Sequence, residues 1–300
     1  LDIAGRFLYN GIRFFHEART FVQEEDTFEF LYSTSVGIER LLKIAVILTE
    51  HDQWDDQEAF EQSLITHSHQ DLVRRLKQHH TLNYGGIHNE FIEILSRFYK
   101  SQRYGRYSLA SVTAPAQERE DLNAFLSKHL NIEIDTQSFF GVTRNEARHK
   151  KFIGKVISKI ALPIFKTIRS QAVRLNIYTY EIEYGSKASK IFQFEDFDFS
   201  KEDILQTELL AYFMSPKSTG SNAKFLRDIE ALSFDPALEA EYIGALRSDV
   251  RKLQTMDELE ELYREEVDNF SSRTEMLGAA SSEHLDYGPD DEAEDEDDVF

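Results

Sequence analysis

The chain has 300 residues, 41% of them hydrophobic and 29% charged, so it can bury a sizeable core in one domain or two. It contains no cysteine, which excludes a disulfide scaffold, a thiol nucleophile and a cysteine-type zinc site, and fits a reducing cytoplasm. The net charge of −20 argues against broad affinity for nucleic acid. No run approaches the length of a transmembrane helix and the first residues lack a signal-peptide pattern, so we expect a cytoplasmic protein without membrane contact.

Apolar residues of helical period predict two helices at the start of the chain, over residues 2–24 and 27–50. The second contains the string GIERLLK, in which Glu39 and Lys43 are four residues apart. We interpret these two residues as a weak surface ion pair. A supporting role beside a later motif helix is the alternative.

Two further helices are predicted over residues 66–78 and 87–101, separated by a Gly-Gly break. His67 and His69 open the first of them but point to different faces. Neither a cysteine nor a dense carboxylate cluster accompanies them. We therefore predict no metal site, and no other cofactor motif is evident.

Arginine and tyrosine alternate where the fourth helix ends, in the sequence RYGRY. Guanidinium groups hold phosphates and tyrosine faces stack on bases, so this stretch can bind RNA. The candidate residues are Arg103, Tyr104 and Arg106. An equal alternative is a glycine-containing loop whose tyrosines cover the end of the bundle.

A helix is predicted over residues 118–130, and the sequence TRNEARH then opens a long helix that extends to about residue 176. Thr143 is the expected N-cap, and Glu146 three residues later completes a capping box. The apolar period that follows predicts a helix packed against a core.

Arg144, Asn145 and His149 are then expected in the first two turns of this helix, with Asn145 and His149 on one face. The combination suits phosphodiester chemistry. A helix N-terminus attracts anions and a guanidinium matches phosphate, while an imidazole takes and gives protons near neutral pH. The positive helix end should disfavour the imidazolium. No metal is needed if the nucleophile is the 2′-hydroxyl of RNA. The alternative is three ordinary polar residues in a solvated turn.

Positive charge accumulates after this motif, where nine basic residues between Arg144 and Arg174 stand against one acid, Glu146. An RNA backbone would explain the excess, as would a partner's acidic surface or the chain's own acidic tail. The candidate RNA contacts nearest the motif are Arg148, Lys150, Lys151 and Lys155.

The motif and the helices before it resemble the HEPN superfamily over residues 1–176. That family is a helical bundle in which an Arg…His motif of this spacing, commonly with a polar residue after the arginine, opens the last core helix. Many members are metal-independent ribonucleases whose active site forms between two copies. The resemblance implies a homodimer in which Arg144, Asn145 and His149 are catalytic. It also implies a toxin or anti-phage defence effector, with an antitoxin or defence-system protein as a possible partner. Some family toxins carry a modified tyrosine two residues after the histidine, where this chain has Lys151.

The pattern changes to alternation over residues 177–199, which predicts a β-hairpin with its turn at residues 185–189. Four helices are predicted after it, over residues 200–214, 223–232, 236–253 and 256–270, the last capped by Thr255. The chain from residue 271 is rich in Ser, Gly and acids and is expected to be disordered. Eight of the nine residues 290–298 are acidic.

The predicted fold class is therefore mainly α: a HEPN-like helical bundle over residues 1–176, a β-hairpin and helical region over 177–270, and a disordered acidic tail over 271–300. The expected function is a metal-independent endoribonuclease. One alternative is a catalytically silent bundle that serves as a binding or dimerisation module. Another is a helical regulatory subunit whose tail mimics nucleic acid. The tail could also compete with RNA for the cations after the motif, or it could only solubilise the chain.

Overall fold

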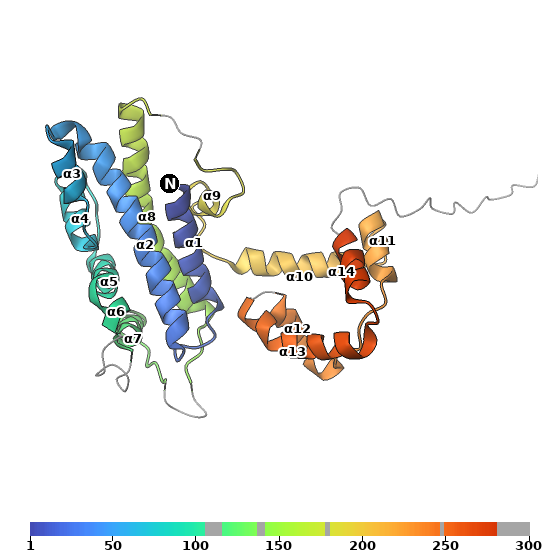
Figure 1. The fold of residues 1–300 in the computed structure, drawn as a ribbon. Helices are drawn as coiled ribbons and strands as arrows, with labels where there is room; N and C mark the ends of the chain where they lie inside the picture. The colour runs from blue at the N-terminus through green and yellow to red at the C-terminus, as the bar shows by residue number, and fades with distance from the viewer. Residues whose placement is uncertain (106–115, 137–141, 178–180, 247–248, 281–300) are drawn as a thin grey trace, which may run out of the picture. The chain divides into compact units, whose positions relative to one another are not determined.

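The computed structural model of the chain describes residues 1–105, 116–136, 142–177, 181–246 and 249–280 (Figure 1). In these ranges the chain is helical, and its one β-type pairing is an isolated bridge between Thr20 and Arg144. The chain forms two compact units, Leu1–Phe199 and Ser200–Phe300. The first unit extends beyond residue 176, where the sequence had suggested that the bundle ends.

The first unit is a bundle of long helices around α2 (Glu24–Glu50), which packs against α1, α4, α7 and α8 (Figure 1). The bounds of the other long helices are α1 Asp2–Glu17, α5 Gly86–Arg97, α7 Gln117–Leu130 and α8 Ala147–Arg174. The helical periods read from the sequence are thus confirmed, and the largest displacement of an end is at α1, which stops at Glu17 and not at residue 24. Because α2 has neighbours on several sides, most of its surface is buried.

A single hydrophobic core runs through the first unit. Aromatic side chains such as Phe30, Phe91 and Phe125 are fully buried in it, together with the apolar stripe of α8. Close approach of α1 and α2 requires a residue without a side chain at Gly11, where an added Cβ would lie 2.5 Å from Oγ1 of Thr34.

Short helices fill one side of the bundle: α3 (Gln57–Ser63), α4 (His69–Lys77) and the turn α6 (Arg103–Gly105). A π-helical turn, η2 (Phe98–Gln102), continues α5 into α6. The helix predicted over residues 66–78 begins later because Ser68 caps it, its Oγ accepting from the Asp71 N–H at 3.3 Å.

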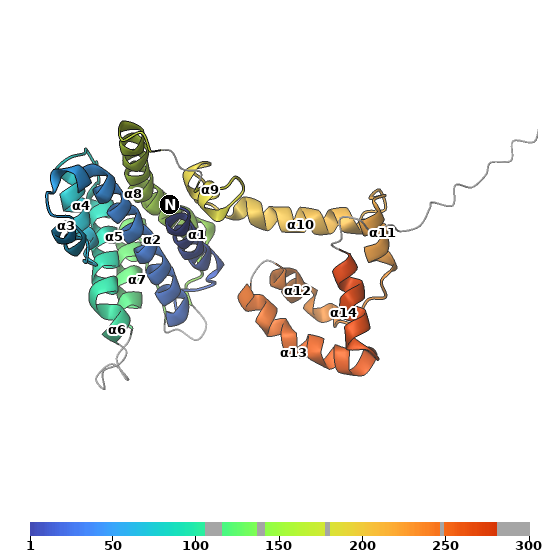
Figure 2. The ribbon, with the colours of Figure 1, turned by 45° about the horizontal axis from the view of Figure 1, so that its top comes forward.

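The predicted β-hairpin is wrong. Residues 178–180 of its first strand lie outside the described residues, and the second strand is replaced by helix α9 (Lys187–Phe192), which packs against α1 (Figure 2). Ser186 caps α9 by accepting from the Ser189 N–H at 3.1 Å. Of the alternating phenylalanines that suggested a strand, Phe192 enters the core from α9 and Phe197 and Phe199 from the segment after it, whereas Phe194 is exposed.

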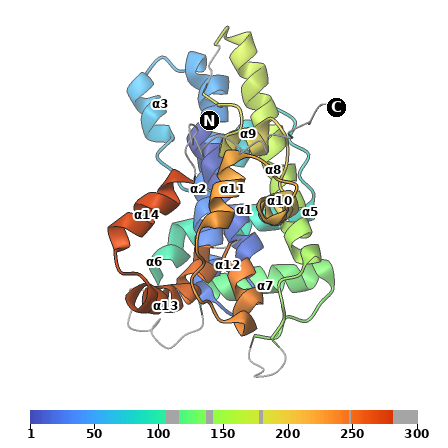
Figure 3. The ribbon, with the colours of Figure 1, turned by 90° about the vertical axis from the view of Figure 1, so that its right-hand side faces the viewer.

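The second unit contains helices only in its described part. Their bounds are α10 Ser200–Met214, α11 Ser221–Asp228, η4 Pro236–Leu238, α12 Glu239–Ala245, α13 Asp249–Glu266 and α14 Phe270–Ala279. Helix α12 packs against α13 (Figure 3). Two predictions fail here: Thr255 lies inside α13 rather than at its cap, and residues 270–279 are helical where disorder was expected. Residues 281–300, which include the acidic run, lie outside the described residues.

Candidate functional site

Helix α8 begins three residues later than its sequence suggested, and Thr143 does not cap it. The N-cap is Glu146 and the first helical residue is Ala147. Thr143 instead pairs with Asp135: its N–H donates to the Asp135 carbonyl at 3.0 Å, and its Oγ1 accepts from the Asp135 N–H at 2.8 Å. Consequently Arg144 and Asn145 precede the helix and do not lie in its first turn.

Asn145 is a buried link between this segment and the end of α1. Its Nδ2 donates to the carbonyl oxygens of Phe15 and Ala18 at 2.6 and 3.1 Å, and its own N–H donates to the carbonyl of Arg19 at 2.8 Å. Only 7% of Asn145 is exposed. Both donors of the amide are therefore used in holding the chain, and they are not directed at solvent.

His149 is buried at the start of α8, with 0% of the residue exposed. Its ring meets Phe21 edge to face at a centroid distance of 5.2 Å. Its Nδ1 accepts from the N–H of Glu146 at 2.9 Å, which satisfies one of the free donors at the helix start. The same device opens α5, where Nδ1 of His88 accepts from the Gly85 N–H at 3.2 Å.

The cap fixes the protonation state of His149. A backbone N–H can only donate, so Nδ1 is unprotonated and a neutral ring carries its proton on Nε2. Nε of Arg148 lies 3.1 Å from that Nε2, which places two donors face to face. The exposed Arg148 side chain is the partner that is free to move away. Burial lowers the pKa of His149 below its ordinary value, and the Arg148 charge lowers it further against the opposing effect of Glu146.

The other predicted residues near the motif lie at the surface. Arg144, Arg148, Lys151 and Lys155 are exposed, and Lys150 is half-buried. Arg148 also pairs with the Glu146 carboxylate at 3.3 Å, and both side chains are more than half exposed. The start of α8 thus presents exposed cations around a buried imidazole. The cations are accessible to an anion, whereas the imidazole must first be uncovered before it can exchange a proton.

The second predicted RNA-binding stretch, which includes Arg103 and Tyr104, follows the C-terminal end of α5. The Arg103 guanidinium stacks over the rings of Tyr99 and Tyr104, at 3.8 and 4.5 Å from their centroids. Tyr104 is exposed, whereas Tyr99 is buried. Arg106 lies outside the described residues. These contacts support a cationic aromatic surface at η2 and do not extend to the start of α8.

The ion pair predicted between Glu39 and Lys43 is present, at 2.6 Å, but it is not a surface pair. Glu39 is 6% exposed because α2 is the central helix. Nδ1 of His67 lies 3.3 Å from both of its carboxylate oxygens. The partners of Glu39 in the described part of the chain are Lys43 on α2 and His67 just before α4, and not a residue of α8, so the supporting role beside the motif helix is not observed. Sequence spacing revealed the pair but could not reveal its burial.

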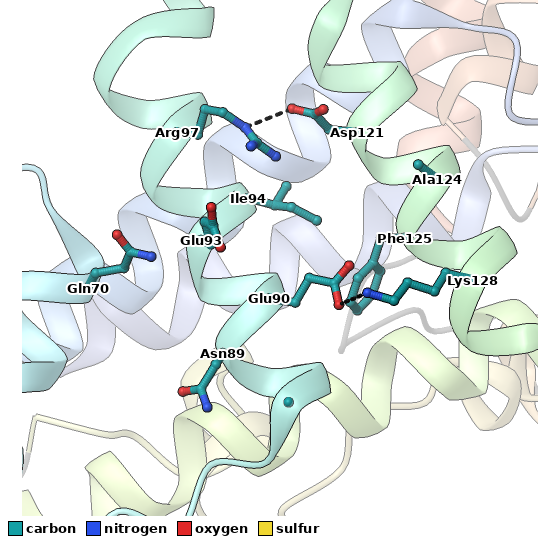
Figure 4. A pocket seen from close by; sticks show the side chains of 11 residues that line it. Gln70, Asn89, Glu90, Glu93, Ile94, Arg97, Asp121, Ala124, Phe125 and Lys128 are labelled. Atoms are coloured by element: carbon teal, nitrogen blue, oxygen red, sulfur yellow. Dashed lines mark hydrogen bonds and ion pairs between the residues drawn. The ribbon is translucent and has the colours of Figure 1, made fainter.

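A groove of about 620 Å³ lies between α5 and α7, away from the motif (Figure 4). Its rim carries two ion pairs that connect the helices, Arg97 with Asp121 and Lys128 with Glu90, each at 2.9 Å. Because these charged groups neutralise one another, the groove offers no concentration of one charge to a ligand. Among the described residues no group of three His, Cys, Asp or Glu side chains could hold a metal ion.

Comparison of the chain with family models, with curated proteins and with solved structures gives no match in any of the three. None of the helices in the described ranges combines the length and the apolar character that crossing a bilayer demands.

Proposed function

We propose that the chain is a HEPN-type, metal-independent endoribonuclease that acts as a homodimer. Its catalytic histidine, His149, is buried and inaccessible to RNA in the free protomer. The observation that carries this proposal is the neutral imidazole of His149 beneath a rim of exposed cations at the start of α8. A toxin or anti-phage defence role, with an antitoxin or another defence protein as partner, follows from the family resemblance.

Opening the site requires two contacts to be released. The Glu146 N–H must leave Nδ1, and the Arg148 side chain must leave the Glu146 carboxylate and so uncover Nε2. A net hydrogen bond is worth about 1 kcal/mol and an exposed ion pair about 0–1 kcal/mol. Binding of a polyanion to the cationic rim can supply this free energy, which makes substrate binding and site opening one event.

The proposed reaction transfers the phosphorus from the 5′-oxygen of the next nucleotide to the 2′-oxygen. One His149 in its neutral form accepts the proton of the 2′-hydroxyl. The His149 of the second copy, which enters the reaction as the imidazolium, gives its proton to the leaving 5′-oxygen. The products are a 2′,3′-cyclic phosphate and a 5′-hydroxyl. Arg144 stabilises the charge on the phosphorane, while Asn145 holds the motif segment in place. One helix start supplies a single imidazole, so both proton transfers need the second copy.

RNA is proposed to bind along the exposed start of α8 through Arg148, Lys150, Lys151 and Lys155. Arg103, Tyr104 and Arg106 would contact bases and phosphates of the same strand, or of another one. Each of these contacts should weaken with salt, because binding releases counterions from the phosphate backbone.

A second candidate function, a catalytically silent bundle that binds or dimerises, is favoured by one observation. The imidazole of His149 has the same capping contact as that of His88, and a cap is a sufficient reason for a buried histidine at this position. In this case the cationic rim binds an anionic partner, and no bond is broken.

The experiment uses this likeness as its control. His149→Ala and His88→Ala each remove an imidazole cap from a helix start, and Trp54 fluorescence and helical circular dichroism show whether each variant folds. Each is incubated in EDTA with an RNA oligonucleotide, and the product ends are identified. We expect cyclic-phosphate products from the His88→Ala protein and none from His149→Ala. Equal cleavage by the two variants would refute the catalytic role.

Arg144→Lys provides a test that does not depend on a buried side chain. Arg144 is exposed, so the substitution leaves the fold intact, but a point charge cannot form the two parallel hydrogen bonds of a guanidinium. We expect a severe loss of cleavage with unchanged thermal melting. If the unaltered protein binds RNA but yields no cyclic phosphate, the silent bundle is the correct function.

A further inference from the structure

A group of polar and aromatic side chains lies near the buried Glu39 in the middle of α2. It is separate from the Arg144–His149 motif at the start of α8. It comprises His67 before α4 and Tyr99 and Arg103 on and after the π-helical turn η2. The His67 and Tyr99 rings meet edge to face at 5.1 Å. π-helical turns are rare in proteins and occur frequently at functional sites. Tyr99 belongs to the hydrophobic core of the first unit, whereas the side chain of His67 is 49% exposed.

Glu39 orients the imidazole of His67. A carboxylate at neutral pH can only accept, so the proton of a neutral His67 lies on Nδ1, 3.3 Å from both oxygens. Its Nε2 is then an unprotonated nitrogen on a side chain that is 49% exposed. This is the reverse of His149, whose Nδ1 is the acceptor and whose ring is buried. Lys43, at 2.6 Å, balances the charge of Glu39, so His67 is not required to neutralise it.

A similar group at the end of α2 shows what a purely structural arrangement looks like. The buried Glu50 binds Nε of Arg75 at 2.6 Å and lies 3.5 Å from Nε2 of His79. The Arg75 guanidinium lies 5.7 and 5.6 Å from the ring centroids of Trp54 and Phe60. Here the arginine forms an ion pair with the carboxylate, and its side chain is mostly buried.

The contacts of Arg103 differ from those of Arg75. Its guanidinium is held by the rings of Tyr99 and Tyr104, and no ion pair with a carboxylate is found for it among the described residues. Its Nε is buried and has no hydrogen-bond partner. Lys100 on η2 is exposed, and Tyr104 is 58% exposed. Near His67 the surface therefore combines unpaired positive charge with an accessible aromatic face.

We propose that this surface is a binding site for a nucleoside phosphate. The phosphate would lie against Arg103 and Lys100, because guanidinium and ammonium groups form charge-assisted hydrogen bonds with its oxygens. His67 would add a third such bond by taking up a second proton beside the phosphate, so that Nδ1–H donates to Glu39 and Nε2–H to a phosphate oxygen. The base would stack on Tyr104, whose ring is already positioned by Arg103. The ligand is either a free nucleotide or one nucleotide of a strand. The proposal shares Arg103 and Tyr104 with the proposed RNA contacts, but it needs neither His149 nor cleavage.

Isothermal titration calorimetry with adenosine 5′-monophosphate, adenosine and inorganic phosphate tests the site in the full chain. Adenosine monophosphate should bind more tightly than either of its halves. Arg103→Ala and His67→Ala should each weaken its binding about tenfold, the effect of losing one charge-assisted hydrogen bond. Arg103→Lys, which keeps the charge, should lose less. Helical circular dichroism and Trp54 fluorescence identify any variant that does not fold.

The chain provides matched controls. His79→Ala removes the other exposed histidine beside a buried glutamate of α2, and Tyr184→Ala removes a tyrosine that is 86% exposed. Both should bind adenosine monophosphate as the unaltered protein does, while Tyr104→Ala should bind it more weakly. Equal affinity in the His67, Arg103 and His79 variants would overturn the proposal.

Two further titrations separate the ligand source and the two sites. Binding of a single-stranded deoxyadenylate decamer but not of the mononucleotide, lost in Arg103→Ala and His67→Ala, would identify the ligand as part of a strand. If neither probe binds, the proposal is wrong. His149→Ala should retain the binding, so failure of the ribonuclease proposal leaves this site standing. Loss of binding in His149→Ala would assign the nucleotide to the start of α8 instead.

Discussion

Replacing Asn145 tests whether this residue stabilises the fold or takes part in chemistry. Asn145→Ala removes the two hydrogen bonds from Nδ2 to the end of α1. Each is worth about 1 kcal/mol net, and carbonyls left buried without a donor add to the cost. The amide Oδ1 is itself buried without a partner, and its removal returns part of this free energy. We therefore expect a loss of about 2 kcal/mol, with Asn145→Asp more destabilising because it places a carboxylate against two carbonyl oxygens.

Urea unfolding followed by Trp54 fluorescence measures this loss. Trp54 is the only tryptophan and belongs to the first unit, so its signal reports that unit alone. The midpoint should fall by about 1 M, given a slope of about 2 kcal/mol/M. Asn123→Ala is the matched control, since this half-buried asparagine makes one long hydrogen bond, 3.4 Å, to the carbonyl of Phe21. A midpoint unchanged in Asn145→Ala together with lost RNA cleavage would show that the residue acts on the substrate.

Three other measurements probe the same bundle. Burial lowers the pKa of His69 to about 4, so below pH 6.5 the unfolded chain binds more protons than the folded chain. The free energy of unfolding should therefore fall as the pH is lowered from 6.5 to 4, by about 3 kcal/mol in total. Urea midpoints at several pH values should show this decrease, and it should be smaller in His69→Gln. Gly154→Ala would place a Cβ 2.7 Å from a backbone oxygen, so it should lower the melting temperature, whereas Gly86→Ala meets nothing within 4 Å and should not. Arg148→Gln removes a positive neighbour and should raise the pKa of His149 in an NMR titration; an unchanged pKa would mean that burial alone lowers it.

The periodic spacing of apolar residues determined the helices of the first unit. The stripes of α1, α2 and α8 are long, and burying them against one another is the main favourable term in folding, so their pattern is readable without coordinates. Local chemistry determined some caps too, but it did not predict that of α8. Thr143 is of a residue type that N-caps prefer, yet the N-cap is Glu146, because Thr143 pairs with Asp135 in the loop before α8.

Tertiary structure decided which motif side chains can meet a substrate. In the sequence, Asn145 and His149 cannot be distinguished from polar residues on an open helix face. In the structure the end of α1 covers Asn145 and Phe21 covers His149, and these partners lie about 130 residues earlier in the chain. The same holds for Glu39, which pairs with Lys43 as its spacing indicates but is buried because α2 is central. Alternation in residues 190–199 indicated a strand, but the chain there is the end of α9 and a segment without a strand, from which Phe192, Phe197 and Phe199 reach the core while Phe194 stays exposed. Whether a residue is buried depends on the segments that pack against it, and here those segments lie far away in the sequence.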